Sequence, residues 1–104
     1  MAAVKTREDI FDRIRKHREQ IRSLGVERLG LFGSFLRDEQ KAGSDVDLLV
    51  RFRPAAKSFD RFMALASLLE DLLQRRVELV TTEGLSPYLG PRILDEVQDV
   101  ALDS

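Results

Sequence analysis

Apolar residues follow helical and strand-like spacings in turn along the chain, and together they predict seven elements. Intervals of three and four residues between apolar positions are typical of helices, whereas short runs rich in branched and aromatic residues between turn signals are typical of strands. We expect helices over residues 6–24, 35–41 and 58–75, a last helix from residue 86 or 90 to about 97, and strands over residues 26–32, 45–52 and 77–81. This order, α-β-α-β-α-β-α, predicts a small α/β (α+β) fold.

Two of these helices begin at residues whose side chains can cap a helix. Thr6 precedes acidic residues in the first turn, and Ser58 precedes the broad apolar face of the long helix. His17 lies on the apolar stripe of the first helix, which favours a structural role. Tyr88, the only tyrosine, is expected to pack against the body through the last helix.

The composition indicates one small domain without disulfide cross-links. A chain of 104 residues that is 43% apolar can fold around a single core, so we expect one domain over residues 1–104. The absence of cysteine excludes disulfides and thiolate metal sites. No apolar run is long enough for a membrane span, and the N-terminus lacks the apolar core of a signal peptide. We therefore expect a cytoplasmic protein that does not bind membranes.

The charge balance argues against a general nucleic-acid-binding protein. The chain has 17 Lys and Arg against 18 Asp and Glu, a formal net charge of −1. Proteins that neutralise many phosphates need a clear positive excess. We therefore expect no direct, stable binding to nucleic acid.

Two carboxylates share one face of the second predicted strand. Asp45 and Asp47 are two residues apart, so their Cα atoms should lie roughly 6.5–7 Å apart with both side chains on the same face. Val46, Leu48 and Val50 then point to the opposite face, into the core. Two carboxylates held this close repel each other unless a cation lies between them. Mg²⁺ prefers oxygen ligands and completes its shell with water and substrate phosphates, so this strand predicts a Mg²⁺–nucleotide site.

Gly33 and Ser34 form the complementary half of such a site. They follow the first strand and open the short second helix, where a glycine lets the backbone turn close to a ligand. Unpaired N–H groups at a helix start favour phosphate, and the Ser34 hydroxyl can add a hydrogen bond. Taken alone, however, Gly-Ser could be a plain turn with a helix cap, and Asp-x-Asp could be a charged strand edge.

Together, these residues resemble the Gly-Ser-x10-Asp-x-Asp signature of the DNA polymerase β-like nucleotidyltransferase superfamily. The resemblance is greatest to the minimal nucleotidyltransferases, or MNT proteins, in which the two segments commonly read Gly-Ser-x-Ala-Arg-Gly and Ser-Asp-x-Asp-Leu-Leu-Val. Here they read Gly33-Ser34-Phe35-Leu36-Arg37-Asp38 and Ser44-Asp45-Val46-Asp47-Leu48-Leu49-Val50. Chain length and element order match as well. The resemblance implies the polymerase β-like fold, with a small three-stranded mixed sheet flanked by helices.

Two positions depart from the MNT pattern. The superfamily takes a third carboxylate from a later strand, and the matching residue is Glu78 where MNT proteins more often have Asp. Glu78 could serve as metal ligand or general base, or it could be a surface residue paired with Arg75 or Arg76. Asp38 replaces the glycine after Arg37. Arg37 itself could contact phosphate or fix the loop through a carboxylate.

The resemblance implies a defined chemistry and a partner. Asp45, Asp47 and Glu78 would be the catalytic and metal-binding residues, holding two Mg²⁺ ions, while Gly33, Ser34 and Arg37 would bind the nucleotide, with ATP as substrate. MNT proteins are typically encoded with a HEPN-domain protein in type VII toxin–antitoxin modules. The chain would then be the antitoxin in a hetero-oligomer, transferring AMP from ATP to a tyrosine hydroxyl of the HEPN RNase toxin and so neutralising it.

Two other functions remain open from the sequence. A binding-only antitoxin would mask the toxin sterically, and the changes at Glu78 and Asp38 are compatible with that function. Alternatively, the chain could be the nucleotidyltransferase subunit of a two-chain enzyme that modifies a small molecule such as an aminoglycoside. A chain of this size leaves little room for a separate substrate-recognition domain, so under each hypothesis the partner supplies the specificity.

Overall fold

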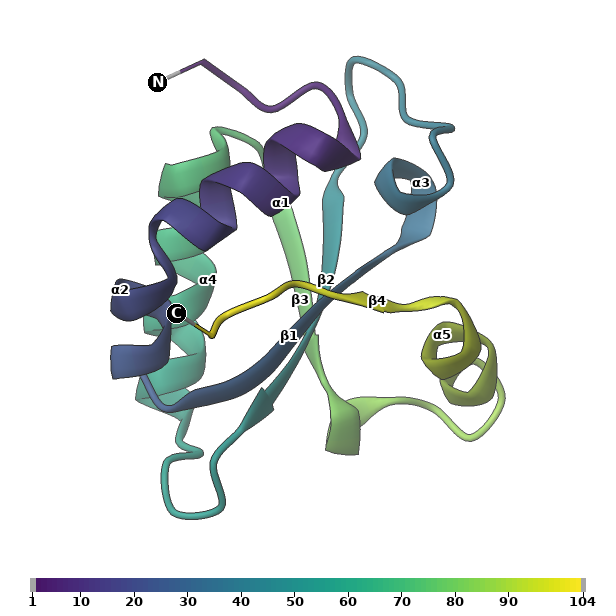
Figure 1. Ribbon diagram of the computed structural model, residues 1–104. Coiled ribbons are helices and arrows are strands. Elements are labelled where there is room, and N and C mark those ends of the chain that lie inside the picture. The colour runs from purple at the N-terminus through teal and green to yellow at the C-terminus, as the bar shows by residue number, and fades with distance from the viewer. Residues whose placement is uncertain (1, 104) are drawn as a thin grey trace.

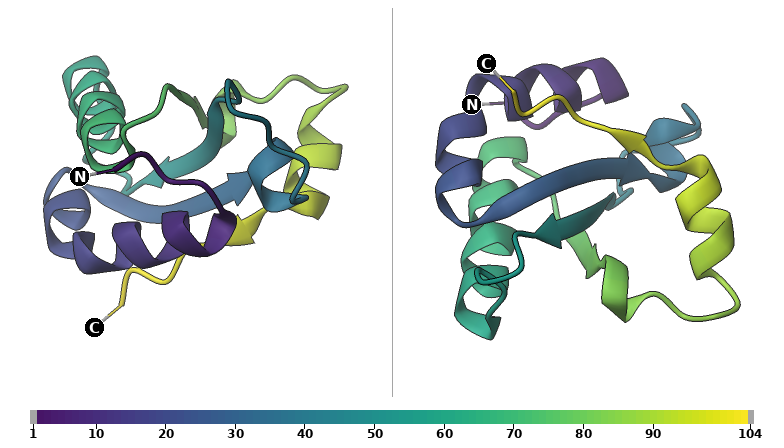
Figure 2. Two further views of the ribbon diagram at one scale, coloured as in Figure 1. Left: turned by 90° about the horizontal axis from the view of Figure 1, so that it is seen from above. Right: turned by 60° about the horizontal axis from the view of Figure 1, so that its bottom comes forward.

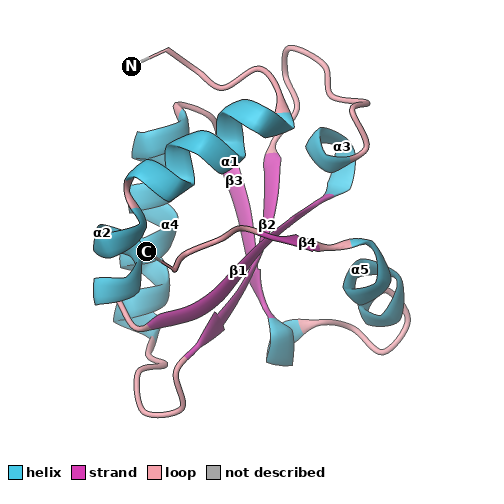
Figure 3. Ribbon diagram, in the orientation of Figure 1, coloured by secondary structure: helices cyan, strands magenta, loops and turns pink. Residues whose placement is uncertain are grey.

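A four-stranded mixed sheet forms the centre of the computed structural model, which describes residues 2–103 (Figures 1 and 3). Its strands are β1 (Val26–Phe32), β2 (Val46–Phe52), β3 (Val77–Thr81) and β4 (Gln98–Asp99). They lie in the order β3-β2-β1-β4. The pairing of β2 is antiparallel with β1 and parallel with β3, and β4 pairs antiparallel with β1.

The helices divide between the two sides of this sheet. They are α1 (Arg7–Lys16), α2 (Arg18–Ser23), α3 (Gly33–Leu36), α4 (Phe59–Leu73) and α5 (Gly90–Glu96), with a 3-10 turn, η1, at Thr82–Gly84. Figures 1 and 2 show α1, α2 and α4 together on one side and α5 on the other. The C-terminal segment runs back from β4 toward α1 and α2 (Figure 2). One face of the sheet is therefore covered by helices, while the other is covered only in part.

The core lies between the covered face of the sheet and α1, α2 and α4. Alternate residues of β2 are fully buried there, as are the inward-facing positions of the helices. The central members are Ile10, Ile14, Ile21, Leu29, Leu31, Val46, Leu48, Val50, Leu65 and Leu69. Because side chains alternate along a strand, the residues between these positions point to the opposite, open face. Asp47 is one of them.

Much of the predicted element order is confirmed. The strands at 26–32 and 77–81 have the predicted bounds, and the first, the long and the last helix are present. The short helix predicted over residues 35–41 lies instead at Gly33–Leu36, because the chain turns at Asp38, whose φ is +59°. Thr6 caps α1 as predicted: its Oγ1 accepts a hydrogen bond from Asp9 N at 3.2 Å, and the Asp9 carboxylate accepts one from Thr6 N at 3.3 Å. The first helix, however, breaks into α1 and α2 at His17, whose Nδ1 lies 2.9 Å from the Arg13 carbonyl oxygen.

Two further expectations were wrong. The sheet has four strands rather than three, because the segment after α5 adds β4 against Gly30 and Leu31 of β1. This strand is only two polar residues long, so it has no local pattern, and it is held in place by the burial of Val100 and Leu102 farther along. Tyr88 does not pack: its side chain is 87% exposed, because α5 begins only at Gly90.

Between residues 2 and 103, no helix combines the length and the apolar character needed to cross a membrane.

Arg75 joins three separate segments near the end of the sheet at which β2 and β3 begin. Its Nε donates to the Val4 carbonyl at 2.6 Å, and its Nη1 donates to the carbonyls of Ala42 at 2.8 Å and Ser44 at 3.5 Å. The guanidinium also lies over the Phe35 ring, 5.1 Å from its centre. Arg75 thus connects the N-terminal segment, the loop before β2 and α3 through one partly buried cation.

We expect Arg75→Met to lower the free energy of unfolding by about 2 kcal/mol, because hydrogen bonds to a charged group are lost and carbonyls are left without their donor. The matched control is Arg76→Met, whose side chain is exposed and which should change stability by less than about 0.5 kcal/mol. Urea unfolding of both variants measures the difference. Equal losses would show that the contacts of Arg75 contribute no stability.

Candidate functional site

The register between β2 and β3 brings two of the predicted carboxylates together on the open face. Asp47 is paired with Glu78 across the parallel strands, so their side chains are neighbours on one face. Glu78 is exposed and Asp47 is half-buried. Asp45 lies just before β2, exposed, and contributes its charge from slightly farther away. The pairing with Asp47 therefore places Glu78 in the candidate site.

The electrostatics of this cluster indicate an excess of negative charge. The pKa of Asp47 is raised to about 6, mainly by burial and in addition by its hydrogen bond and charge interaction with Glu78 and by the charge of Asp45. Arg37 lowers this pKa, but more weakly. Over residues 2–103, the positive charge of Arg37 therefore does not offset the effects that raise the pKa of Asp47.

The chemistry of the donor set fits a hard divalent cation. Carboxylate oxygens, together with oxygens of water and phosphate, are the ligands that Mg²⁺ prefers. Over residues 2–103, no three Asp, Glu, His or Cys side chains converge as in an assembled metal site. Asp47 and Glu78 are adjacent, whereas Asp45 does not form a group of three with them.

Gly33 sits directly against the Asp47 carboxylate. Its backbone has a φ of +78°, and a Cβ at this position would overlap the carboxylate of Asp47. The register explains this closeness, since Phe32, the last residue of β1, pairs with Asp47. Only glycine combines this conformation with this lack of a side chain. The backbone of the turn that leads into α3 therefore lies in direct contact with the Asp47 side chain.

Ser34 follows in the first turn of α3 and is half-buried. The helix is a single turn, and it is held to the body by the buried side chains of Phe35 and Leu36. The Ser34 carbonyl accepts a hydrogen bond from Glu39 N at 2.9 Å, which folds the following loop back over the helix. Ser34 is thus fixed beside Gly33, next to the carboxylate cluster.

Arg37 forms ion pairs with two carboxylates. Its Nε lies 2.6 Å from Glu39 and its Nη1 lies 2.5 Å from Glu96 at the end of α5. The hydrogen bond to Glu39 is the largest reason why the pKa of Arg37 is raised, followed by that to Glu96. Of the two roles considered for Arg37, fixing the loop is the one seen in the structure. A contact between Arg37 and phosphate stays a prediction.

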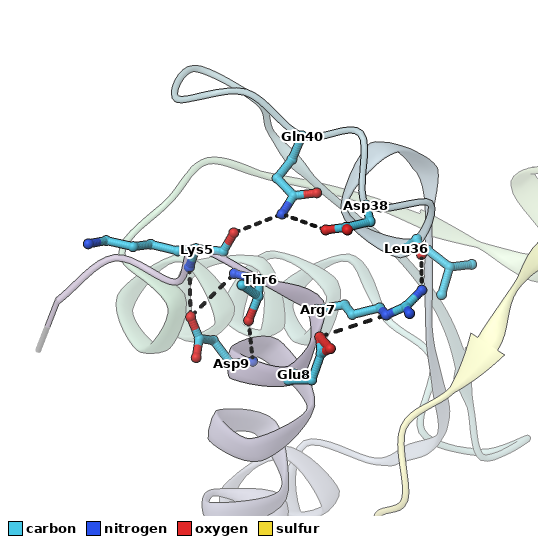
Figure 4. Close-up of polar contacts among 8 residues, drawn as sticks. All are labelled: Lys5, Thr6, Arg7, Glu8, Asp9, Leu36, Asp38 and Gln40. Atoms are coloured by element: carbon cyan, nitrogen blue, oxygen red, sulfur yellow. Dashed lines mark hydrogen bonds and ion pairs between the residues drawn. The ribbon is translucent and has the colours of Figure 1, made fainter.

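The structure also explains the departure at Asp38. This residue has a φ of +59°, a left-handed conformation that suits the glycine of the MNT pattern and that Asp tolerates better than most residues. Figure 4 shows how the loop is then held: Gln40 Nε2 donates to the Lys5 carbonyl at 2.8 Å, and Arg7 Nη1 donates to the Leu36 carbonyl at 2.7 Å. The turn keeps its shape without the glycine.

Glu78 has no ion pair with Arg75 or Arg76 within the described part of the chain. Arg75 donates instead to backbone carbonyls, as described above. The structure therefore does not support the alternative in which Glu78 is a surface residue paired with one of these arginines.

A cavity of about 160 Å³ lies on the same open face, between the sheet and the end of α5. Gly30 and Leu49 line it from the sheet, and Leu94 and Val97 from α5 and its C-terminal end. These residues are not among the site residues predicted from the sequence. One signal was available: a glycine inside a strand often marks close approach by another segment, and a Cβ on Gly30 would overlap the Val97 side chain.

Comparison with known proteins places this geometry in a family. The nucleotidyltransferase domain family matches residues 14–100. A protein adenylyltransferase, MntA of Thermococcus cleftensis, is 38% identical over 96 residues, which cover 91% of this chain and 96% of the relative. The solved structure of a minimal nucleotidyltransferase is 35% identical, with a TM-score of 0.69, over 85% of this chain and 93% of the other.

Two more distant structures share the fold. One is a toxin–antitoxin complex with AMP-PNP, 22% identical with a TM-score of 0.63, covering 81% of this chain and 72% of the other. The second is a tri-AMPylated Shewanella oneidensis HEPN toxin in complex with MNT antitoxin. It is 20% identical with a TM-score of 0.56, covering 83% of this chain and 70% of the other.

These matches confirm the predicted resemblance and fold class. The family match begins within α1 and ends just after β4, so it includes the Gly33 turn, both carboxylate strands and α5. On this evidence, the chain belongs to the nucleotidyltransferase domain family, and its relatives include the minimal nucleotidyltransferases.

Proposed function

We propose that this chain is a Mg²⁺-dependent protein adenylyltransferase that transfers AMP from ATP to a tyrosine hydroxyl of a HEPN RNase toxin, and thereby acts as its antitoxin. One observation carries the proposal: Asp47 lies between Glu78 on the neighbouring strand and the backbone of Gly33. A carboxylate pair for metal and proton transfer is thus joined to a turn that can approach phosphates. The names of the relatives, among them a protein adenylyltransferase and an AMPylated HEPN toxin with its MNT antitoxin, support the substrate and the partner.

Each site residue has a role in this proposal. Asp45, Asp47 and Glu78 would hold Mg²⁺, which supplies positive charge to the phosphates and neutralises charge that develops during transfer. The Gly33 turn and the Ser34 hydroxyl bind the terminal phosphates. Arg37, which follows α3, is close enough to Asp47 to lower its pKa and would contact the same phosphates. Glu78 accepts the proton of the acceptor hydroxyl, a role for which its exposed position beside Asp47 suits it.

The transfer itself exchanges one phosphorus–oxygen bond for another. The phenolic oxygen of the acceptor forms a bond to the α-phosphorus of ATP while its proton passes to the carboxylate of Glu78. The bond between the α-phosphorus and the oxygen bridging to the β-phosphate breaks, and pyrophosphate leaves with that electron pair. The products are an AMP–tyrosine phosphodiester and pyrophosphate.

A binding-only antitoxin is the second candidate. The observation that favours it is that Asp45 does not converge with Asp47 and Glu78 over the described residues. In that case the chain would neutralise the toxin by covering it, and nucleotide transfer would be unnecessary.

The Asp45→Ala/Asp47→Ala double variant separates the two candidates. Since metal ions contribute several kcal/mol to such reactions, we expect AMP transfer to the HEPN partner to fall by about a thousandfold, and toxin neutralisation to be lost. Mass spectrometry of the partner after incubation with ATP and Mg²⁺ measures the transfer, and size-exclusion chromatography checks that the complex still forms. A double variant that still neutralises the toxin would favour steric masking.

The closeness of Gly33 and Asp47 gives a second prediction. Gly33→Ala forces a left-handed conformation on a residue with a Cβ, which costs about 1–3 kcal/mol, and pushes on the Asp47 carboxylate. We expect lower stability in urea and at least about a tenfold loss of AMP transfer from the misplaced carboxylate. Gly43→Ala is the matched control, because a Cβ there has open space around it. Equal activity of both variants would contradict this role for Gly33.

The raised pKa of Asp47 predicts an unusual pH dependence of stability without metal. The folded chain holds the Asp47 proton up to about pH 6, whereas the unfolded chain releases it near the ordinary value of 3.8. Between these values the folded state binds more protons, so this group stabilises the fold at low pH and its contribution is lost as pH rises. Melting temperatures in a chelating buffer should show this loss in the wild type but not in Asp47→Asn.

Added Mg²⁺ should raise the melting temperature of the wild type more at pH 7 than at pH 5, because a cation then replaces the missing proton. Asp47→Asn should show little of this effect. A wild type whose metal-free stability follows that of Asp47→Asn at every pH would show that the carboxylates do not interact as described.

A further inference from the structure

The Gly33 turn, the carboxylates and the cavity beneath α5 follow one another along the open face of the sheet. Two rows of paired residues follow the Gly33 turn along the open face. The first row is Phe32, Asp47 and Glu78, and the second is Gly30, Leu49 and Val80. The cavity begins at this last row, on Gly30 and Leu49. Successive rows on one face lie roughly 6.5–7 Å apart. The carboxylates are therefore flanked by the phosphate-binding turn on one side and by the cavity on the other.

This arrangement matches the requirement of an in-line displacement. The attacking and leaving oxygens lie on opposite sides of the phosphorus. If pyrophosphate leaves toward the Gly33 turn, the attacking hydroxyl must come from the opposite side, where the cavity lies. One row spacing is comparable to the length of a phenol side chain, so a ring in the cavity can bring its hydroxyl to Asp47 and Glu78.

The size of the cavity suits one six-membered ring. Its volume is about 160 Å³. A cavity of about 150 Å³ lined by apolar side chains takes up benzene, whereas a purine with its ribose needs considerably more space. Leu49, Leu94 and Val97 supply apolar contact surface, and Thr82 adds a hydroxyl at the edge. These features favour an aromatic side chain over the nucleoside of ATP.

The charged residues at the edge of the cavity point to the same occupant. Arg28 and Arg51 are paired across β1 and β2, and both line the cavity. Each is already engaged by a carboxylate: Arg28 pairs with Asp99, and Arg51 Nε lies 3.5 Å from Glu27. Their charges are therefore balanced locally, which suits a neutral ring more than a phosphate. Guanidinium groups can also stack on aromatic faces.

We propose that this cavity is the acceptor site, which takes the phenol ring of a tyrosine of the partner protein and directs its hydroxyl toward Asp47 and Glu78. The inference rests on the proposed function and specifies which part of the chain receives the acceptor. The bond changes are those given above, with the phenol oxygen entering from the cavity side.

The first test measures occupancy of the cavity directly, with p-cresol as the probe. Titration of the isotope-labelled chain should shift the NMR methyl signals of Leu49, Leu94 and Val97, and saturating AMP-PNP with Mg²⁺ should leave this binding intact. The absence of these shifts would overturn the proposal. Displacement of p-cresol by AMP-PNP would also overturn it and would assign the cavity to the nucleoside.

The second test fills the cavity by mutation. Leu94→Trp places a large side chain at its wall, and because Leu94 is 54% exposed the chain should still fold. We expect AMP transfer to the HEPN partner to fall by at least about tenfold through loss of acceptor positioning, while AMP-PNP affinity stays within about twofold of wild type. The matched control is Leu89→Trp, since Leu89 also belongs to this region but does not line the cavity.

The outcomes distinguish this inference from the proposed function. If the wild type transfers AMP and Leu94→Trp transfers it equally well, the acceptor site is wrong and the proposed function stands. If Leu94→Trp loses AMP-PNP affinity as well as transfer, the cavity belongs to the nucleotide, and the acceptor site is again wrong. If the wild type transfers no AMP to a partner that it binds, the proposed function fails, whatever p-cresol shows.

Discussion

Repulsion among carboxylates on an open sheet face is the constraint on which the site depends. Asp47 and Glu78 are held side by side by the parallel register of β2 and β3, and this register is fixed in turn by the buried residues on the other face of β2. The core thus supplies the free energy that keeps like charges together. Such a site is more stable with a bound cation than without one, because the cation relieves the repulsion between the carboxylates. A metal-dependent transferase needs this property.

The parts that could be predicted are those encoded within one short segment. The Gly33 turn and the carboxylates of Asp45 and Asp47 lie within fifteen residues, and the bounds of β1 and β3 follow from local alternation and turn residues. The parts that could not be predicted are made by distant segments. β4 exists because the tail beyond it is buried, and Arg75 acts through three separate stretches of chain. Likewise, the α5 cavity joins residues as far apart in the sequence as Arg28 and Asp99.

The unequal covering of the two faces accounts for how so small a chain can hold an active site. α1, α2 and α4 are all used on one side to bury the core, which leaves a single short helix, α5, for the other (Figure 2). α5 is connected to α3 by Arg37 and Glu96, and it leaves Leu94 and the neighbouring Tyr88 exposed. The open face is therefore bordered by protein without being closed, so that a macromolecular substrate has access to it.

The strict alternation of β2 has one more consequence. Val46, Leu48 and Val50 belong to the core and Asp47 to the site, so a slip of β2 by one residue would bury a carboxylate and turn the core side chains to solvent. No slipped pairing can be stable, and none can be active. Correct assembly of the hydrophobic core and correct placement of the Asp47 carboxylate on the open face are thus a single event.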